Sequence, residues 1–173
     1  MILLAYSTVD GHTRTICERL REWVEAAGRP VTLATLEQAA TLDLGGFHAV
    51  VVGASIRYGH HRDNVLAFAN DRAERLNAMP SAFFSVNIVA RKPQKNRAET
   101  NPYVQKFLAR VRWRPALVDV FAGRLDYPRY RFVDRQMIRL IMLLTRGPTD
   151  PRTAVEFTDW RRVQEFAQRV AAM

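Results

Sequence analysis

Short apolar runs of strand length recur along the chain and alternate with segments of helical period. The runs are ILLAY (2–6), VTLATL (31–36), AVVVGA (49–54), SAFFSV (81–86) and ALVDVF (116–121). Nearly continuous apolar strands separated by amphipathic segments are typical of a parallel sheet with crossover helices on both faces. The pattern therefore predicts an α/β domain built on five parallel strands.

Four segments between or after these runs repeat their apolar residues at helical spacing. The apolar faces are Ile16, Leu20, Trp23, Val24 and Ala27; Val65, Phe68, Ala69 and Leu76; Val104, Phe107, Leu108 and Val111; and Val163, Phe166, Ala167 and Val170. Gly28 and Pro30 suit the end of the first helix. Asn101, followed by Pro102, suits the cap of the third, and Asp159 suits the cap of the last.

Residues 124–152 interrupt this alternation and are too long for an ordinary connection. The run TAVEF (153–157) that follows predicts the resumption of an edge strand, so we interpret 124–152 as an insertion that splits strand five. The 173 residues are expected to form one domain, 1–173, because a single core is still efficient at this length.

The chain is basic, because 26 Lys and Arg against 17 Asp and Glu give a net charge of +9. This balance favours anionic partners: nucleic acid, acidic lipid or an anionic small molecule. Cys17 is the only cysteine, which excludes an intramolecular disulfide and a cysteine-based metal site, and its helical position predicts a buried thiol. We expect no metal site, no secretion signal and no membrane-spanning helix.

The stretch YSTVDGHTRT (6–15) joins the first strand to the first helix and is rich in hydroxyl groups. Ser7, Thr8, Asp10, Gly11 and Thr13 all fall in this turn. Ligands of open parallel sheets bind beyond the carboxyl ends of the strands, where N–H groups and the positive end of a helix favour an anion. Lacking the P-loop and dinucleotide glycine patterns, the loop is expected to hold a phosphate monoester. The alternative is that Asp10 and Thr13 only cap the helix.

The pattern S-T-x-D-G-x-T after the first strand is similar to the phosphate loop of the flavodoxin superfamily. Further stretches are GASIRYGHHR (53–62), MPSAFFSVNIVARKP (79–93), WRP (113–115), YPRYRFVDRQMIRLIM (127–142) and FTDW (157–160). Together they closely resemble, essentially end to end, the bacterial family of quinone-dependent protoporphyrinogen IX dehydrogenases. The resemblance implies a flavodoxin-like sheet of order 2-1-3-4-5 with helices on both faces.

It also implies an FMN enzyme of haem biosynthesis that oxidises protoporphyrinogen IX to protoporphyrin IX and passes electrons to menaquinone or ubiquinone. In this interpretation the phosphate is held by Ser7, Thr8, Asp10, Gly11, His12 and Thr13. The loops 55–59 and 85–90 hold the isoalloxazine ring through Ser55, Ile56, Arg57, Tyr58 and Gly59, and through Ser85, Val86, Asn87 and Ala90. His12 departs from the family pattern, where a neutral amide is expected, and its imidazole could still donate to phosphate.

No side-chain nucleophile is needed, because the flavin carries the redox chemistry. The candidate catalytic groups are Arg57, Tyr58 and His60. With Arg91 and Lys92, Arg57 would stabilise a reduced, anionic flavin and raise its potential. The alternative is that Arg57 is a solvated or salt-bridged surface residue.

The substrate has two propionates, and guanidinium groups pair well with carboxylates. The candidates for the propionates are Arg91, Lys92, Arg129 and Arg131. Tyr58, Tyr127 and Tyr130 are candidates to lie against the tetrapyrrole faces. His60 or His61 could accept a pyrrole proton, although adjacent histidines after a loop are more often surface residues.

Within the insertion, residues 130–145 predict a short helix with Arg131, Arg135 and Arg139 in one basic stripe and an apolar remainder. Residues 124–150 carry six Arg against three Asp, or +3. Such a helix suits an anionic membrane surface where a quinone is met, and predicts a peripheral protein on the cytoplasmic side of the inner membrane. The alternative is that this face packs on the domain or in the seam of a homo-oligomer.

Residues 91–114 are also basic, with eight Lys and Arg against one Glu. We do not expect a nucleic-acid partner, because no binding motif or stacking platform of aromatic residues accompanies the charge. Two other functions remain open: a flavodoxin-like electron carrier that docks on an acidic partner, and an FMN-dependent NAD(P)H:quinone reductase.

Overall fold

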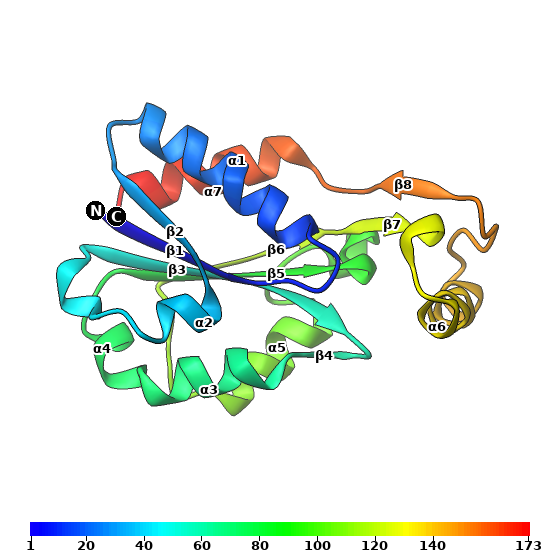
Figure 1. Ribbon diagram of the computed structural model, residues 1–173, viewed down its shortest axis with the longest axis horizontal. Coiled ribbons are helices and arrows are strands. Elements are labelled where there is room, and N and C mark those ends of the chain that lie inside the picture. The colour runs from blue at the N-terminus through cyan, green and yellow to red at the C-terminus, as the bar shows by residue number, and fades with distance from the viewer.

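Five parallel strands form the central sheet of the computed structural model, which describes residues 1–173 (Figure 1). These strands are β1 (Ile2–Ser7), β2 (Val31–Thr35), β3 (Ala49–Arg57), β5 (Ser81–Asn87) and β6 (Leu117–Ala122). Their order is β2-β1-β3-β5-β6, and the short β4 (His60–His61) pairs antiparallel with the end of β3. Leaving β4 aside, this is the predicted order 2-1-3-4-5, and the flavodoxin-like fold class is confirmed.

Helices cover both faces of the sheet, as the apolar periodicity predicts. In Figure 1, α1 and α7 lie on one face and α3, α4 and α5 on the other, while both chain ends lie at the same end of the sheet. The helices of the domain are α1 (His12–Ala26), α2 (Leu36–Ala39), α3 (Asp63–Asp71), α4 (Ala73–Asn77), α5 (Pro102–Arg110) and α7 (Trp160–Ala171). Each face of the sheet buries its own hydrophobic cluster, of 18 and 17 residues respectively, so both faces are closed to solvent.

The predicted helix boundaries are confirmed at three ends. Asn101 accepts hydrogen bonds from the amides of Tyr103 and Val104, and Asp159 caps α7 in the same way. Gly28, at φ 81°, follows the end of α1. The second predicted helix is interrupted, because the chain breaks at Arg72 into α3 and α4.

Strand β3 is packed tightly against a side chain of β5 at Gly53. Its cross-strand partner is Phe84, whose ring lies over the glycine so closely that an added Cβ would sit 2.2 Å from Cζ of the ring. Only a glycine allows this packing. The contact lies inside the core, just before the polar end of β3.

The insertion forms a separate unit beyond the carboxyl end of β6. It consists of β7 (Arg124–Asp126), α6 (Phe132–Leu144) and β8 (Ala154–Glu156), and Figure 1 shows α6 at the end of the molecule opposite the termini. The expectation that 153–157 resumes an edge strand of the central sheet is wrong. β8 pairs antiparallel with β7 in a two-stranded sheet of its own, because the insertion forms a small hydrophobic cluster that holds these two strands together.

Two other sequence predictions concern single features. Cys17 is buried in α1, and burial raises the pKa of its thiol well above the ordinary value. None of the helices, α6 included, combines the length and the apolar character that crossing a bilayer requires.

Candidate functional site

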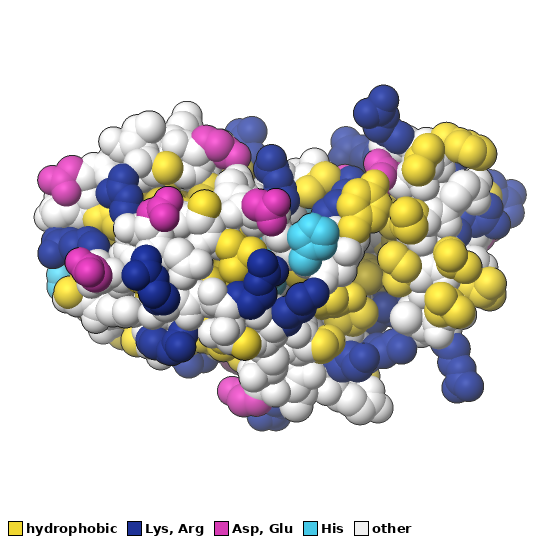
Figure 2. Space-filling view, turned by 90° about the horizontal axis from the view of Figure 1, so that it is seen from below, with side chains coloured by type: hydrophobic (Ala, Val, Ile, Leu, Met, Phe, Trp, Pro, Cys, Tyr) yellow, Lys and Arg dark blue, Asp and Glu magenta, His cyan; other side chains and the backbone are white.

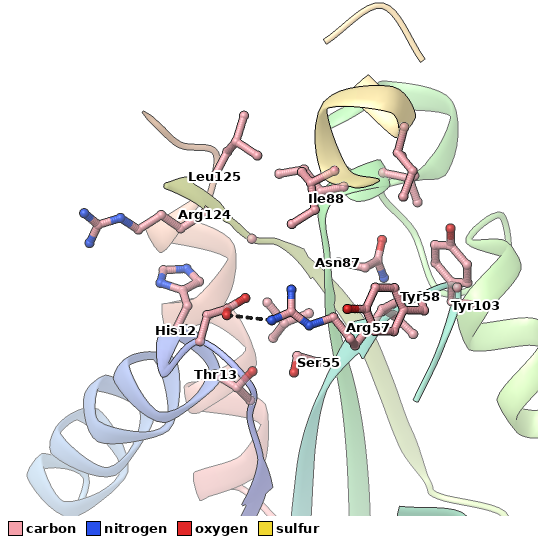
Figure 3. Close-up of a pocket in the computed structure, with 18 of the residues that line it drawn as sticks. His12, Thr13, Ser55, Arg57, Tyr58, Asn87, Ile88, Tyr103, Arg124 and Leu125 are labelled. Atoms are coloured by element: carbon pink, nitrogen blue, oxygen red, sulfur yellow. Dashed lines mark hydrogen bonds and ion pairs between the residues drawn. The ribbon is translucent and has the colours of Figure 1, made fainter. Parts of the chain in front are cut away.

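A pocket of about 140 Å³ lies between the carboxyl ends of the central strands and helix α6 (Figure 3). Its polar side comes from the loop after β1 and from the end of β3. Its opposite side is apolar and comes largely from the insertion, through Leu125, Met137, Ile138, Ile141 and Met142. A ligand in this pocket would therefore have one polar and one apolar end.

The loop after β1 is built to leave donors free. Gly11 turns the chain at φ 85°, and its amide donates to Thr8 Oγ1 over 3.0 Å. No side chain caps α1, so the alternative that Asp10 and Thr13 serve as helix caps is wrong. The first-turn N–H groups of α1, beside the pocket residues His12 and Thr13, therefore have no side-chain acceptor.

Two buried hydroxyl groups at the pocket have no hydrogen-bond partner. Thr13 is 1% exposed, and neither its Oγ1 nor Ser55 Oγ at the end of β3 has a partner. Both residues line the pocket, and Figure 3 shows them on the same side of it. Because an unpaired buried hydroxyl costs free energy, two of them in one pocket indicate that a bound polar group completes the site.

Arg57 joins three elements in one charged cluster. Its guanidinium lies 3.0 Å from the Asp10 carboxylate and 3.8 Å from that of Asp134 on α6. Tyr58, at φ 51°, also donates its hydroxyl to Asp134. Burial raises the pKa of Asp10, and the positive charge of Arg57 opposes this shift.

This cluster decides between the two interpretations of Arg57. The arginine is salt-bridged, as the alternative proposed, but its side chain is only 17% exposed. Two carboxylates already balance its charge, so it does not act as a free cation beside the pocket. Asp10 is likewise occupied by Arg57 and contributes an anion, not a phosphate donor, to the loop.

His12 lies at the start of α1 and has a fixed hydrogen-bonding role. Its Nε2 is 2.7 Å from Thr158 Oγ1, while the Thr158 hydroxyl lies 2.8 Å from the carbonyl oxygen of Ala122. Because the carbonyl can only accept, the threonine donates to it and His12 Nε2 must donate to the threonine. Burial lowers the pKa of His12, which favours the neutral ring, and in that ring Nδ1 is the acceptor because Nε2 carries the proton.

Most of the predicted cofactor residues line the pocket, but four do not. Those that do are Thr8, Asp10, His12, Thr13, Ser55, Ile56, Arg57, Tyr58, Gly59, Val86 and Asn87. Ser7, Gly11, Ser85 and Ala90 do not line it. Ser85 is fully buried and bonds to His61 and Asn87, so it supports the site from inside.

Two of the predicted substrate residues, Arg91 and Tyr127, have structural roles instead. Arg91 donates to the carbonyls of Ile88 and Thr145, which fastens the insertion to the domain, and burial lowers its pKa. Tyr127 is fully buried and donates to Pro148, so it cannot lie against a tetrapyrrole.

The remaining candidates are divided. Tyr130 lines the pocket, and its hydroxyl bonds to the backbone of residues 124 and 126. Lys92, Arg129 and Arg131 do not line it. His60 is exposed and does not line the pocket, whereas His61 is 4% exposed and packs between aromatic rings, so the surface expectation for His61 is wrong.

Sequence reasoning missed part of the pocket wall. Tyr103 of α5 and the segment 123–125 were not predicted as site residues. The segment was open to prediction, because it follows the fifth strand at its carboxyl end. Nothing in the sequence marks Tyr103 as a pocket residue. It reaches the pocket because it lies in the first turn of α5, and the position of that turn depends on the tertiary structure.

Comparisons with known proteins agree with this geometry. The Flavodoxin domain family matches residues 3–152. The chain is 46% identical to a protoporphyrinogen IX dehydrogenase (quinone) of Escherichia coli (strain K12), over 98% of the chain and 93% of that protein. It is 44% identical to the protein of the same name from Leishmania major, over 99% of the chain and 74% of the relative.

Solved structures of flavodoxins share the fold at low identity. Oxidised Flavodoxin 1 from Bacillus cereus superposes with a TM-score of 0.55 at 11% identity, covering 99% of this chain and 97% of its own. A short-chain flavodoxin associated with a bacterial microcompartment gives the same TM-score at 13% identity, covering 98% and 97%. At these identities the structural similarity shows a shared fold and nothing about function.

Proposed function

The chain belongs to the flavodoxin domain family and, within it, to the protoporphyrinogen IX dehydrogenases (quinone), and from this we propose its reaction. It oxidises protoporphyrinogen IX to protoporphyrin IX in haem biosynthesis, with FMN as cofactor and a membrane quinone as electron acceptor. The family implies a flavin. The identity of the flavin as FMN rests on the pocket.

The two unpaired hydroxyls of the pocket carry the proposal: Thr13 Oγ1 on the phosphate side and Ser55 Oγ in the loop that would hold the ring. Thr13 Oγ1, the Thr8 side chain and the free first-turn amides of α1 suit one terminal phosphate group. The bound flavin supplies two-electron redox chemistry. The loops 55–59 and 86–88 border the pocket beside this end and would hold the ring.

The reaction requires three passes, because protoporphyrin IX has six electrons and six protons fewer than protoporphyrinogen IX. Three quinones take them up and become three quinols, so the electrons and protons balance. The residues of this chain position the reactants and exclude water. The apolar wall from α6, which includes Met137, Ile138 and Ile141, suits both the macrocycle and a quinone ring.

Anaerobic mixing of the flavin-loaded protein tests the proposal. Protoporphyrinogen IX should bleach the flavin absorbance, and added menaquinone or ubiquinone should restore it, whereas reduced nicotinamide should have no effect. Bleaching by reduced nicotinamide alone would indicate the quinone reductase. No bleaching by either donor would indicate the electron carrier. Release of FMN on denaturation identifies the cofactor in the same sample.

We also propose that α6 binds the cytoplasmic surface of the inner membrane, where quinones reside. Support comes from the outward face of the helix, which exposes Phe132, Val133, Leu140, Leu143 and Leu144 by 54% or more. Figure 2 shows hydrophobic side chains gathered at this end of the molecule, with Lys and Arg around them. Such a face is suited to the boundary between headgroups and acyl chains.

The predicted arginine stripe is only partly available to lipid. Arg135 and Arg139 donate to the carbonyls of Tyr130 and Thr149, so they brace the insertion. Arg131 is exposed at the beginning of α6. Apolar contact should therefore contribute more to binding than charge.

Replacing Leu140 and Leu143 with serine should lower binding to vesicles containing anionic lipid about tenfold, because each leucine loses part of its interfacial burial. Vesicle flotation measures the effect, and the pair Leu140→Ile and Leu143→Ile should bind like the wild type. Deleting the helix would be less informative, since Ile141 and Met142 form the pocket wall. Unchanged flotation with a shift from dimer to monomer would show instead that this face is a subunit seam.

A further inference from the structure

The cations that border the pocket are already neutralised within the protein. Arg57 faces Asp10 and Asp134, and Arg124 lies 2.9 Å from Asp126. A carboxylate of a substrate would have to displace these partners before it could bind. If the proposed function holds, the two propionates need other cations, close to the pocket mouth and without partners.

Helix α5 offers two such cations. Lys106 and Arg110 are exposed, and neither has a carboxylate within 4.0 Å or a side-chain hydrogen bond to the protein. They lie one turn apart on the same helix face, because they are separated by four residues. Their charges are therefore adjacent and unused.

The same helix face leads directly from the pocket. Tyr103 lines the pocket, and Lys106 and Arg110 follow it at spacings of three and seven residues, which places all three on one stripe of α5. A second hollow continues past Gly59 and Tyr103, and both cations line it. The stripe therefore runs from the apolar pocket mouth outward to two free positive charges.

Figure 2 looks onto this side of the molecule. It shows Lys and Arg side chains around a histidine near the middle of the face, with the apolar side chains of the insertion beside them. His60 and His61 both line the second hollow, and of the two only His60 is exposed. An apolar surface thus borders a basic one across the mouth of the pocket.

We propose that Lys106 and Arg110 bind the two propionates of the tetrapyrrole, an inference that rests on the proposed function. The propionates sit on neighbouring pyrroles, so they project from one edge of an otherwise apolar macrocycle. Lys106 and Arg110 form a matching pair of charges beside an apolar wall. The macrocycle enters with its apolar edge toward α6 and its carboxylates toward α5, and the pair selects for a dicarboxylate substrate.

The test is the double variant Lys106→Gln and Arg110→Gln. For protoporphyrinogen IX, KM should rise about tenfold with kcat retained, because two solvent-exposed ion pairs to the substrate are lost. For the dimethyl ester of protoporphyrinogen IX, the variant and the wild type should have the same KM. Both side chains are exposed and unpaired, so the fold and the FMN content should not change.

The pair Arg75→Gln and Lys95→Gln removes the same charge from exposed positions outside both hollows and is the matched control. It should leave the KM for the diacid at the wild-type value, and Lys106→Arg should retain most of the affinity. An unchanged KM in the double variant, with an active wild type, would overturn this inference alone. A wild type that does not oxidise protoporphyrinogen IX would overturn the proposed function, and this inference with it.

Discussion

Replacing Thr13 with valine is expected to weaken FMN binding by 10- to 100-fold while leaving the flavin-free protein at least as stable as the wild type. A hydrogen bond to a charged group contributes about 1.5–3 kcal/mol, which corresponds to this change in affinity. In the flavin-free protein Thr13 Oγ1 is buried and unpaired. Valine removes that unpaired hydroxyl and keeps the shape of the side chain, so the free energy of unfolding should not fall.

The opposite directions of the two effects make this prediction specific. Fluorescence titration with FMN measures the affinity, and urea unfolding of the flavin-free protein measures the stability. Thr15→Val, one half-turn further along α1, is the control, because Thr15 is exposed and its hydroxyl lies 3.4 Å from the Gly11 carbonyl. Equal FMN affinity in Thr13→Val and the wild type would mean that the hydroxyl faces no ligand group.

The parts of the fold that follow from local chemistry could be predicted from the sequence. The five strands are continuous apolar runs, and α5 and α7 begin at residues whose side chains accept their first-turn amides. Such signals act over a few residues and need no knowledge of the tertiary structure. The hydroxyl-rich loop was visible for the same reason.

What the sequence could not give was the partner of each charged or aromatic residue. In the sequence, Arg91 and Arg57 are both isolated cations. In the structure, Arg91 donates to backbone carbonyls and holds the insertion, whereas Arg57 forms ion pairs with two carboxylates. Tyr127 and Tyr130 both follow β6, the fifth strand of the parallel sheet, but only Tyr130 reaches the pocket. These differences depend on how the insertion folds back, which brings Asp134 of α6 to Arg57 at the end of β3, more than seventy residues earlier in the chain.

The separation of β8 from the central sheet has a similar origin. A short run such as TAVEF satisfies the pattern of an edge strand and of a ribbon strand equally well. Its pairing with β7 depends on the insertion cluster of Leu125, Tyr127, Tyr130 and Met142, against which Val155 of β8 packs, and the run itself does not show this contact. The insertion therefore gains its own small core and presents α6 over the pocket.

The free energy of unfolding should fall by about 3 kcal/mol between pH 7 and pH 4 because of His61. The ring is buried beside Phe83 and Phe107, and this burial lowers its pKa from the usual 6.5 to about 3. Between these values the unfolded chain binds a proton that the folded protein does not, so acid favours unfolding. The contribution is fully present above pH 6.5 and is lost progressively as the pH falls toward 3.

Urea unfolding of the wild type and of His61→Phe at pH 7 and pH 4 tests this, since phenylalanine suits the aromatic surroundings and cannot be protonated. Carboxylates affect both proteins equally, so the variant should lose about 3 kcal/mol less than the wild type. His60→Phe, at an exposed site one residue away, should follow the wild-type curve. Parallel curves for His61→Phe and the wild type would contradict the prediction. Because β4 pairs His61 with Ile56 of the ring-side loop, acid should also release FMN from the wild type sooner than from the variant.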